Sequence, residues 1–597
     1  MKVIFVSHIC VARKITNAYK EIIFSLNPTC SYILGTRKII YLDFANIYEH
    51  ELEWKKYFLY NSIVEKIVLK LNEIFFNYNL DYKKKNWLIF NDFSYVIKIW
   101  YDTLLFHSKI LHYIVTKFNP SILEFPNYTN IKIDNDFLID DNTSIIEKLA
   151  RENLKIKIHY YLINNEDILI QSKFTFGQPN FYFKIPRIKQ KLKNIFQYLK
   201  IYYLLKFKKI KHLGIGCDEI NYIHDNNRII NFEYLSVTKN NKLSKQFILE
   251  IYKILNSHKF FKFKNIKFLF FFIKLIESIY LKTEFYLKEY KYLNKLINKN
   301  NLKTFVFQTM SPFYYPVFIF RKIAQEKKIR IINWVHGGYF TYSNPGYDVV
   351  DYKFSHNHIG YGKYLIKLLK NKKININLIN KKKFNVDYVG SFKFDDLHYK
   401  NYHSYNKKKK ITFFIGCQMN MNQFYYGYNR KNACTSIWRE QVDIIKILYR
   451  FSNKYEIIIK DYPSGSKHLW KNIIKTEFKN NITYVSGEKN IVEIFKESDL
   501  NIFPWVSTTF FESLYYDADV FLYDEDLYEG PFINKFNKEL VWSKNIMYFK
   551  RKLLNYLIKG KFYKTDKSIL RDYFINYNMD NESKRKRFFS IIDNLKQ

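Results

Sequence analysis

A cluster of hydroxyl groups lies between two short apolar runs in the last quarter of the chain. Ser507, Thr508 and Thr509 follow the run Leu500–Phe503, and Glu512 comes three residues after Thr509. If the cluster begins a helix after a buried strand, its hydroxyl and backbone N–H groups lie where α/β proteins hold phosphate groups. Glu512 then projects from the first turn, and its carboxylate can accept hydrogen bonds from ribose. The pattern Thr509-x-x-Glu512 is also a capping box that stabilises a helix without a ligand, so two interpretations stay open.

A second motif, His336-Gly337-Gly338, follows the largely apolar run Ile329–Val335. Glycines at the end of a strand let backbone N–H groups approach a ligand closely. A histidine there has a pKa suited to proton transfer, and its charged form pairs with phosphate. We therefore take His336 and Gly337 as candidate catalytic residues. A tight turn with a hydrogen-bonded histidine is the structural alternative.

Lys460 and Gly416 follow two further apolar runs. Lys460 comes after Glu456–Ile459, and the serine-glycine start of a predicted helix follows it, which is a reasonable anion site. Gly416 comes after Ile411–Ile415 and lets a ligand or another backbone approach. A charged loop is the alternative interpretation for Lys460. The predicted donor-binding residues are Gly416, Lys460, Ser507, Thr508, Thr509 and Glu512.

Strand and helix patterns alternate along most of the chain, which predicts an α/β fold with mainly parallel sheets. In the last third we expect strands at Ile411–Ile415, Glu456–Ile459, Thr483–Val485, Leu500–Phe503 and Val520–Tyr523. Near the N-terminus we expect strands at Val3–Val6, Lys38–Phe44, Trp87–Phe90 and Ser121–Phe125, with helices over Glu51–Phe76 and Ile99–Phe118. The motifs above then share the carboxyl ends of strands, where ligands bind in such sheets.

These motifs resemble those of GT-B glycosyltransferases, especially bacterial surface-carbohydrate and capsule transferases and CDP-glycerol glycerophosphotransferases. Those families carry a His-Gly pair closing the N-terminal domain, a Lys-x-His-Pro after a C-terminal-domain strand, and a Ser/Thr-rich helix start followed by Glu. His336-Gly337 matches the first motif, and Ser507 to Glu512 matches the third. The middle motif differs, because Tyr462 stands where the family has histidine. The resemblance covers roughly residues 305 to 525.

The resemblance implies two Rossmann-like domains in a GT-B-like arrangement. Residues 1–380 form an acceptor-side α/β domain with a helical, basic insertion at about 140–300. Residues 381–575 form a nucleotide-sugar-binding domain, and residues 576–597 form a basic tail.

The implied activity is metal-independent transfer of a sugar, without a cofactor, from a nucleotide-activated donor. The acceptor is a cell-surface polysaccharide or a lipid-linked glycan or oligosaccharide of capsule or lipopolysaccharide. Two alternatives stay open: a polyol-phosphate or glycerophosphate transferase of the same fold, and a noncatalytic nucleotide-sugar-binding partner in a glycan assembly complex.

The chain is strongly basic, with 97 Lys and Arg against 55 Asp and Glu and a net charge of +42 among 597 residues. This charge attracts anionic lipid surfaces and phosphorylated substrates. We expect no nucleic-acid partner, because the lysines are spread along the chain without a focusing motif. The five cysteines are scattered, with no Cys-x-x-Cys pair, so we predict no disulfide framework, no metal site and a cytoplasmic location.

Two basic, apolar segments are candidates for membrane contact, Arg187–Lys211 and Lys259–Leu281. Such segments lie in anionic lipid interfaces by burying one apolar face. The apolar block Phe268–Ile273 is interrupted by Lys274 and falls short of the ~18 residues that a membrane span needs. We therefore expect peripheral contact with the inner face of the cytoplasmic membrane. The alternative for both segments is an ordinary helix packed on its own core.

Overall fold

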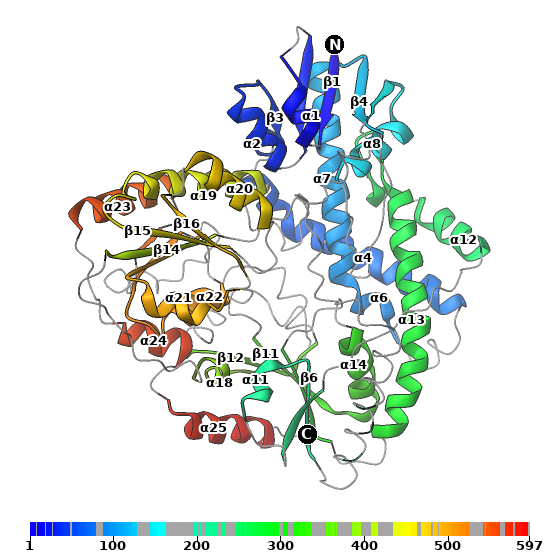
Figure 1. Ribbon diagram of the computed structural model, residues 1–597. Coiled ribbons are helices and arrows are strands. Elements are labelled where there is room, and N and C mark those ends of the chain that lie inside the picture. The colour runs from blue at the N-terminus through cyan, green and yellow to red at the C-terminus, as the bar shows by residue number, and fades with distance from the viewer. Residues whose placement is uncertain are drawn as a thin grey trace.

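The structure is a computed structural model of residues 1–597. It describes the chain apart from residues 8, 18–19, 27, 48–49, 79–86, 128–141, 163–195, 197–198, 200–202, 204–209, 224–227, 233–244, 257, 298–301, 309–314, 336–353, 364–365, 367–384, 396–407, 416–433, 462–466, 479–480, 488, 505–506, 524–540, 544, 561–566, 577–578 and 595–597. Three parallel sheets form separate layers, at the top, left and bottom of Figure 1. The predicted α/β fold with Rossmann-like sheets is confirmed.

The sheet at the left of Figure 1 has the strand order β16-β15-β14-β17-β18-β19, the doubly wound order of dinucleotide-binding folds. Its strands are β14 (Lys410–Phe414), β15 (Glu456–Lys460), β16 (Thr483–Val485), β17 (Leu500–Phe503), β18 (Asp519–Tyr523) and β19 (Val541–Ser543). The first five match the predicted strands within one residue, and β19 was not predicted.

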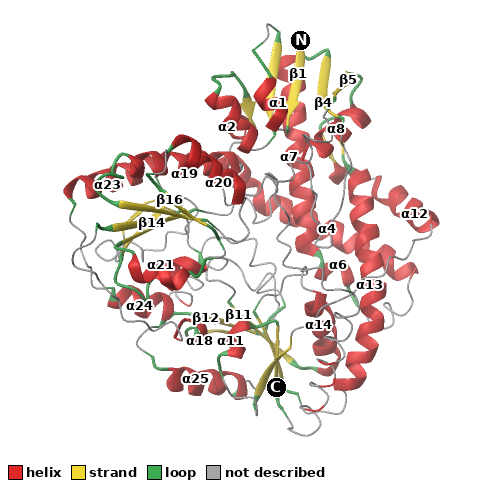
Figure 2. Ribbon diagram, in the orientation of Figure 1, coloured by secondary structure: helices red, strands yellow, loops and turns green. Residues whose placement is uncertain are grey.

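Helices cover both faces of this sheet (Figure 2), so its strands are nearly continuous apolar runs. Ile411 and Phe413 of β14 face one core cluster, and Phe414 faces the other. The helices are α19 (Cys434–Tyr449), α20 (Lys467–Glu477), α21 (Ile491–Glu497), α22 (Thr508–Ser513) and α23 (Ile546–Lys559).

The sheet at the bottom of Figure 1 has the order β13-β12-β11-β10-β6-β7. Its strands are β6 (His212–Ile215), β7 (Ile229–Phe232), β10 (Thr304–Phe307), β11 (Arg330–Trp334), β12 (Asn357–Gly360) and β13 (Asn385–Tyr388). Its helices include α11 (Asp218–Asn221), α14 (Tyr315–Lys327) and α18 (Phe392–Asp395). β6 falls on the run Leu213–Gly216, which the sequence pattern also allows as a strand, whereas β7 lies in the part of residues 140–300 that we expected to be helical.

The N-terminal sheet has its own order, β3-β2-β1-β4-β5, and is a third doubly wound layer beyond the two that we predicted. Its strands are β1 (Lys2–Val6), β2 (Glu21–Ser25), β3 (Leu42–Asp43), β4 (Ile122–Pro126) and β5 (Lys157–Tyr161). Its short helices are α1 (Ile9–Lys14), α2 (Pro28–Thr36), α3 (Phe44–Ile47) and α8 (Asn142–Asn153). The strand predicted at Trp87–Phe90 is wrong, because Ile89–Asp92 forms helix α6 and Trp87 is fully buried before it.

Long helices connect the N-terminal sheet to the sheet of β6 and β10, on the right of Figure 1. They are α4 (His50–Tyr78), α7 (Ser94–Phe118) and α13 (Leu269–Ile297), with α12 (Lys245–Asn256) beside α13. One core cluster runs through all of them, from Phe5 of β1 to Phe307 of β10. The short turn η1 (Lys259–Phe261) and the hairpin β8 (Lys262–Phe263) and β9 (Ile266–Lys267) precede α13.

The packing of these helices rules out membrane contact through one of the two candidate segments. Phe271, Phe272 and Leu275 of Lys259–Leu281 are fully buried in the shared core. The apolar face that would enter a lipid interface is therefore occupied by protein, and this segment follows the alternative of an ordinary packed helix. No helix among the described residues is long and apolar enough to cross a membrane.

The C-terminal residues return to the sheet of β11 and β12. Helix α24 (Ser568–Ile575) is followed by α25 (Asn581–Asp593), which lies in the stretch that we assigned to a basic tail. The Phe588 ring lies 5.0 Å from the Trp334 ring of β11, and Arg587 Nε donates to the Tyr388 carbonyl at 2.6 Å. The last helix therefore packs against the sheet of β11 and β13, which belongs to the N-terminal half of the chain.

An ion pair joins the N-terminal sheet to the helices of the β14 sheet. Arg439 of α19 donates to Asp43 at the end of β3 at 2.7 Å and to the Tyr41 hydroxyl at 2.9 Å. Asp43 is fully buried and also accepts from Ser31 at 3.2 Å. The Asp43 carboxylate is thus shared between two layers of the fold.

Candidate functional site

The carboxyl edges of the two six-stranded sheets face each other. Tyr361 follows the end of β12, and its ring lies 6.2 Å from that of Phe511 on α22, the helix after β17. Helix α24 closes the side of this contact, with the Phe574 ring 5.8 Å from Phe511. A Cβ at Gly362 would lie 2.1 Å from the Tyr573 carbonyl oxygen, so only glycine admits α24 so close. Because ligands bind at such edges, we expect a substrate where the two edges meet.

The hydroxyl cluster begins a helix as predicted, but with a different cap. Ser507 is the N-cap of α22, and its hydroxyl accepts from the backbone N–H of Phe510 at 3.2 Å. Thr508 and Thr509 are half-buried in the first turn. The capping box from Thr509 to Glu512 is therefore not formed, because the cap lies two residues earlier and Phe510 stands at the position where a box requires Glu or Gln. The alternative in which Glu512 only caps the helix is therefore not supported.

Glu512 is a buried carboxylate near the end of α22 rather than in its first turn. The residue is 8 % exposed, and none of the described residues donates a hydrogen bond to its carboxylate. Burial raises its pKa from 4.5 to about 7, and the charge of Lys393 acts in the opposite direction. A buried acid that no described residue satisfies is a common feature of binding and catalytic sites.

Lys393 and its neighbour Glu219 are site residues that the sequence did not reveal. Glu219, on α11 after β6, accepts from the Ser391 hydroxyl at 2.6 Å and from the backbone N–H groups of Phe392 and Lys393 at 2.8 and 3.2 Å. Burial still raises its pKa to about 7. The ammonium of Lys393 acts on the carboxylates of both Glu219 and Glu512. Lys393 therefore lies between an acid of each half, in the segment that connects them.

Lys460 ends β15 beside β14, at the same edge of the sheet. Its ammonium donates to the carbonyls of Asp461 at 3.0 Å and Ser486 at 2.9 Å. The side chain is nearly buried, and burial lowers its pKa to about 8. One N–H donor therefore supports the chain just after β15 and a second supports the loop after β16, and the third has no acceptor among the described residues.

Gly416, His336 and Gly337 lie outside the described residues, but the strands before them are placed. β14 ends at Phe414, next to β17 in the sheet, where the strand order reverses. That reversal is the usual ligand position in a doubly wound sheet, and α22 begins there. β11 ends at Trp334, and the N–H of Val335 donates to the Ile359 carbonyl of β12. The chain thus enters His336 from the edge that carries Tyr361.

Asp517 and Asp519 have the Asp-x-Asp spacing of some metal sites, but they lie away from this edge of the sheet. Asp519 begins β18 and accepts from the Tyr556 hydroxyl, and Asp517 pairs with Arg571 at 3.1 Å. Both carboxylates are thus engaged at the amino end of a strand. The part of the chain that the structure describes holds no group of three or more His, Cys, Asp or Glu side chains arranged for a metal ion.

No family model and no curated protein matches the chain. Solved structures match at low similarity. A glycosyltransferase from Rickettsia africae aligns at 12% identity over 67% of this chain and 95% of its own, with a TM-score of 0.38. HepE of Anabaena, in complex with UDP and glucose, aligns at 10% identity over 65% and 100%, with a TM-score of 0.37. The wall teichoic acid polymerase TagF aligns at 12% identity over 69% and 98%, with a TM-score of 0.30. The fold assignment therefore rests on the sheet topology itself.

Replacing Glu512 by Gln should flatten the pH dependence of stability. Because burial favours the protonated carboxyl, its contribution to stability is full below about pH 4.5 and is lost as the pH rises through about 7. Above pH 7, Glu512→Gln should therefore raise the free energy of unfolding, by up to roughly 3 kcal/mol. Urea unfolding between pH 4.5 and 8 measures this.

Glu493→Gln, at an exposed position on α21, is the matched control and should leave the pH slope unchanged. A Glu512→Gln protein that is less stable than wild type at pH 8 would show that the anion makes a stabilising contact within the chain.

Proposed function

We propose that this chain is a GT-B-type glycosyltransferase. It moves a sugar from a nucleotide-activated donor to a cell-surface polysaccharide or lipid-linked glycan of capsule or lipopolysaccharide. The observation that carries this proposal is the buried, unsatisfied Glu512 beside Lys393, between the facing carboxyl edges of two doubly wound sheets. That combination offers an acceptor for ribose hydroxyl groups next to a cation for phosphate.

The donor nucleotide sits on α22 and the ends of β14 and β15 in this proposal. Glu512 accepts the ribose hydroxyls, and Ser507, Thr508, Thr509 and Gly416 approach the phosphates. The remaining N–H of Lys460 and the ammonium of Lys393 stabilise the leaving diphosphate. Rate enhancement then comes from positioning and from stabilisation of negative charge, without a metal or other cofactor.

The experiment that tests the donor site is a panel of nucleoside diphosphates read by thermal shift, since a ligand raises apparent stability by mass action. One nucleotide should stabilise the protein, and Glu512→Gln should weaken its affinity by roughly tenfold or more, because two hydroxyl donors lose a charged acceptor. Glu493→Gln should bind like wild type. Equal affinities in all three proteins would remove Glu512 from the donor site.

His336 is proposed to act on the acceptor side, either as the general base or as a phosphate contact. If it takes the acceptor's proton, His336→Ala should lower turnover on the order of a hundredfold with nucleotide affinity nearly intact. If it contacts the donor phosphates, affinity and turnover should fall together. Nucleotide release in the presence of a lipid-linked acceptor measures turnover. A variant with wild-type turnover and affinity would exclude both roles.

We further propose that the segment Arg187–Lys211 holds the protein at an anionic membrane. Five of its residues are described. Phe196, Leu199 and Tyr203 are helical and exposed, by 70%, 58% and 56%, whereas Ile210 at the end of the segment is buried in the core and Lys211 beside it is exposed. The spacing of Phe196, Leu199 and Tyr203 by three and four places them on one helix face. The sequence interleaves them with lysines, the pattern of an interfacial helix.

The triple variant Phe196→Ser, Leu199→Ser, Tyr203→Ser should reduce flotation with anionic vesicles by about tenfold or more. Flotation of the wild-type protein should also fall with salt, because the lysine contribution is screened. A control triple variant at Met547, Ile558 and Ile569, which are exposed to a similar degree, should float like wild type. Salt-independent flotation, or equal loss in both variants, would contradict this membrane contact.

A further inference from the structure

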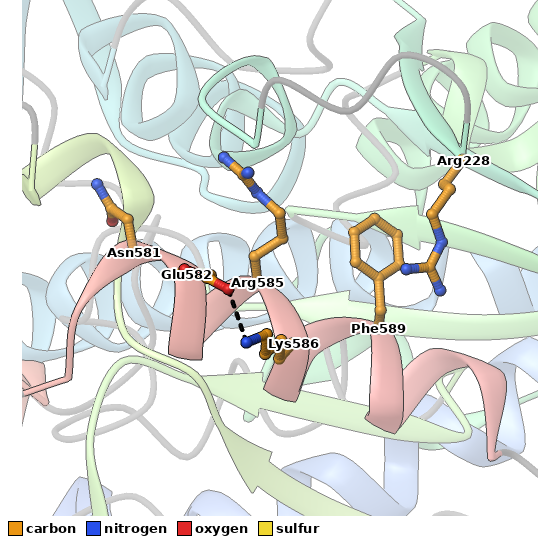
Figure 3. Close-up of a pocket in the computed structure, with 6 residues that line it drawn as sticks. All are labelled: Arg228, Asn581, Glu582, Arg585, Lys586 and Phe589. Atoms are coloured by element: carbon orange, nitrogen blue, oxygen red, sulfur yellow. Dashed lines mark ion pairs between the residues drawn. The ribbon is translucent and has the colours of Figure 1, made fainter.

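A basic hollow lies between α25 and the edge strand β7, away from the candidate donor site. Its volume is about 510 Å³, and Figure 3 shows the six residues that line it. They are Arg228, Asn581, Glu582, Arg585, Lys586 and Phe589. Arg228 immediately precedes β7, at the amino edge of its sheet, whereas the donor site lies at the carboxyl edge. Whatever binds here is not the nucleotide at α22.

One face of α25 forms most of the lining of the hollow. The five lining residues that belong to α25 are spaced so that their side chains lie on one side of the helix. The other side of α25 is committed to the core, where Phe588 and Ile592 are buried and Lys584 is fully covered. The hollow is therefore supported by a rigid wall rather than by a loop.

Three of the residues that line the hollow are positively charged and one is negatively charged. Glu582 pairs with Lys586 at 2.6 Å, and both side chains are exposed. Arg228 pairs with Asp593, and its guanidinium covers the Phe589 ring at 3.6 Å. Asp593 also contacts His212 at 3.0 Å, so each of its two carboxylate oxygens has a partner. These pairs fix Arg228 and leave no carboxylate for a third cation.

Arg585 is that third cation. It is only half-exposed, and its Nε is buried without a hydrogen-bond partner among the described residues. No carboxylate among the described residues pairs with Arg585, so the exposed part of its side chain is left for an anion that enters the hollow. The planar guanidinium fork matches the oxygens of a phosphate group in a bidentate contact.

We propose that this hollow binds the phosphate group of a larger phosphorylated molecule, with Arg585 as the principal contact and Arg228 beside it. The hollow is larger than a bare phosphate, so it has room for the organic group of a phosphorylated molecule. Two sources share this chemistry, a soluble phosphorylated compound and the headgroup of an anionic phospholipid.

Titration with inorganic phosphate and flotation with phosphatidylglycerol vesicles distinguish the sources. Arg585→Gln should weaken one of these two interactions by about tenfold, because it removes charge and fork together. Arg585→Lys keeps the charge and should weaken the same interaction by only about threefold. Arg551→Gln, an exposed arginine on α23 that lies over a tyrosine ring, is the matched control and should leave both interactions unchanged.

Loss in the phosphate titration alone assigns the hollow to a soluble compound, and loss in flotation alone assigns it to lipid. The experiment is carried out on the full chain, and nucleoside diphosphate binding should be the same in all variants. If wild type, Arg585→Gln and Arg551→Gln behave alike with both probes, the proposal is overturned. The graded Arg585→Lys variant keeps the test valid should Arg585→Gln fold poorly.

Discussion

Two carboxylates, Glu219 and Glu512, are buried in different halves of the molecule and share the charge of Lys393. Removing a carboxylate from water is unfavourable unless hydrogen bonds or opposite charge replace its hydration. Glu219 has that replacement, because three donors at the start of α18 surround it. Among the described residues, Glu512 has only the charge of Lys393. The difference separates a carboxylate that holds the connection between the halves from one that is free to meet a ligand.

The position of Glu512 depends on how closely the two sheets approach. Tyr361 and Phe511 touch across the interface, and α24 fits against Gly362 with no room for a side chain. On the other side of the molecule, Arg439 reaches Asp43 of the N-terminal sheet. Each of the three sheets is thus joined to another by at least one contact that tolerates little change in geometry. Glu512 follows Phe511 in this packed interface, and burial raises the pKa of its carboxyl.

Parts of the fold could be read from the sequence because of how parallel sheets bury their strands. Buried on both faces, strands such as Leu500–Phe503 are short, uninterrupted apolar runs, and the helices between them have a clear period. The same rule failed at Trp87–Phe90, where a short apolar run begins a buried helix, since length and period cannot distinguish the two. It also missed β2, because Glu21–Ser25 has polar residues at both ends. Without β2, the N-terminal sheet could not be recognised as a layer of its own.

The site was accessible to sequence reasoning only where chemistry and chain position coincide. Ser507 to Glu512 lie together after one strand, so their types and spacing indicated a helix start and an acid beside it. The contact between Glu219 and residues 391 to 393 joins positions more than 170 apart along the chain, and no local pattern encodes it. The spacing also suggested the wrong cap. Ser507 and Thr509 are both residues that commonly cap helices, and the structure shows that Ser507 is the cap.

The composition of the chain hid the lysines that matter. The sequence contains 97 basic residues, and residue type alone does not distinguish one from another. Their burial in the structure does. Lys98 is buried against Asp102 at 2.7 Å, and Lys460 and Lys567 are buried against backbone carbonyls. These ammonium groups contact acceptors of their own chain and support the elements around them, and Lys460 keeps one N–H donor beyond its two carbonyl contacts. Lys393 differs, since it is half-buried and its charge acts on a carboxylate from each half. Exposed lysines more than a Debye length away are screened by salt, so this partly buried ammonium acts on Glu219 and Glu512 more than distant surface lysines do.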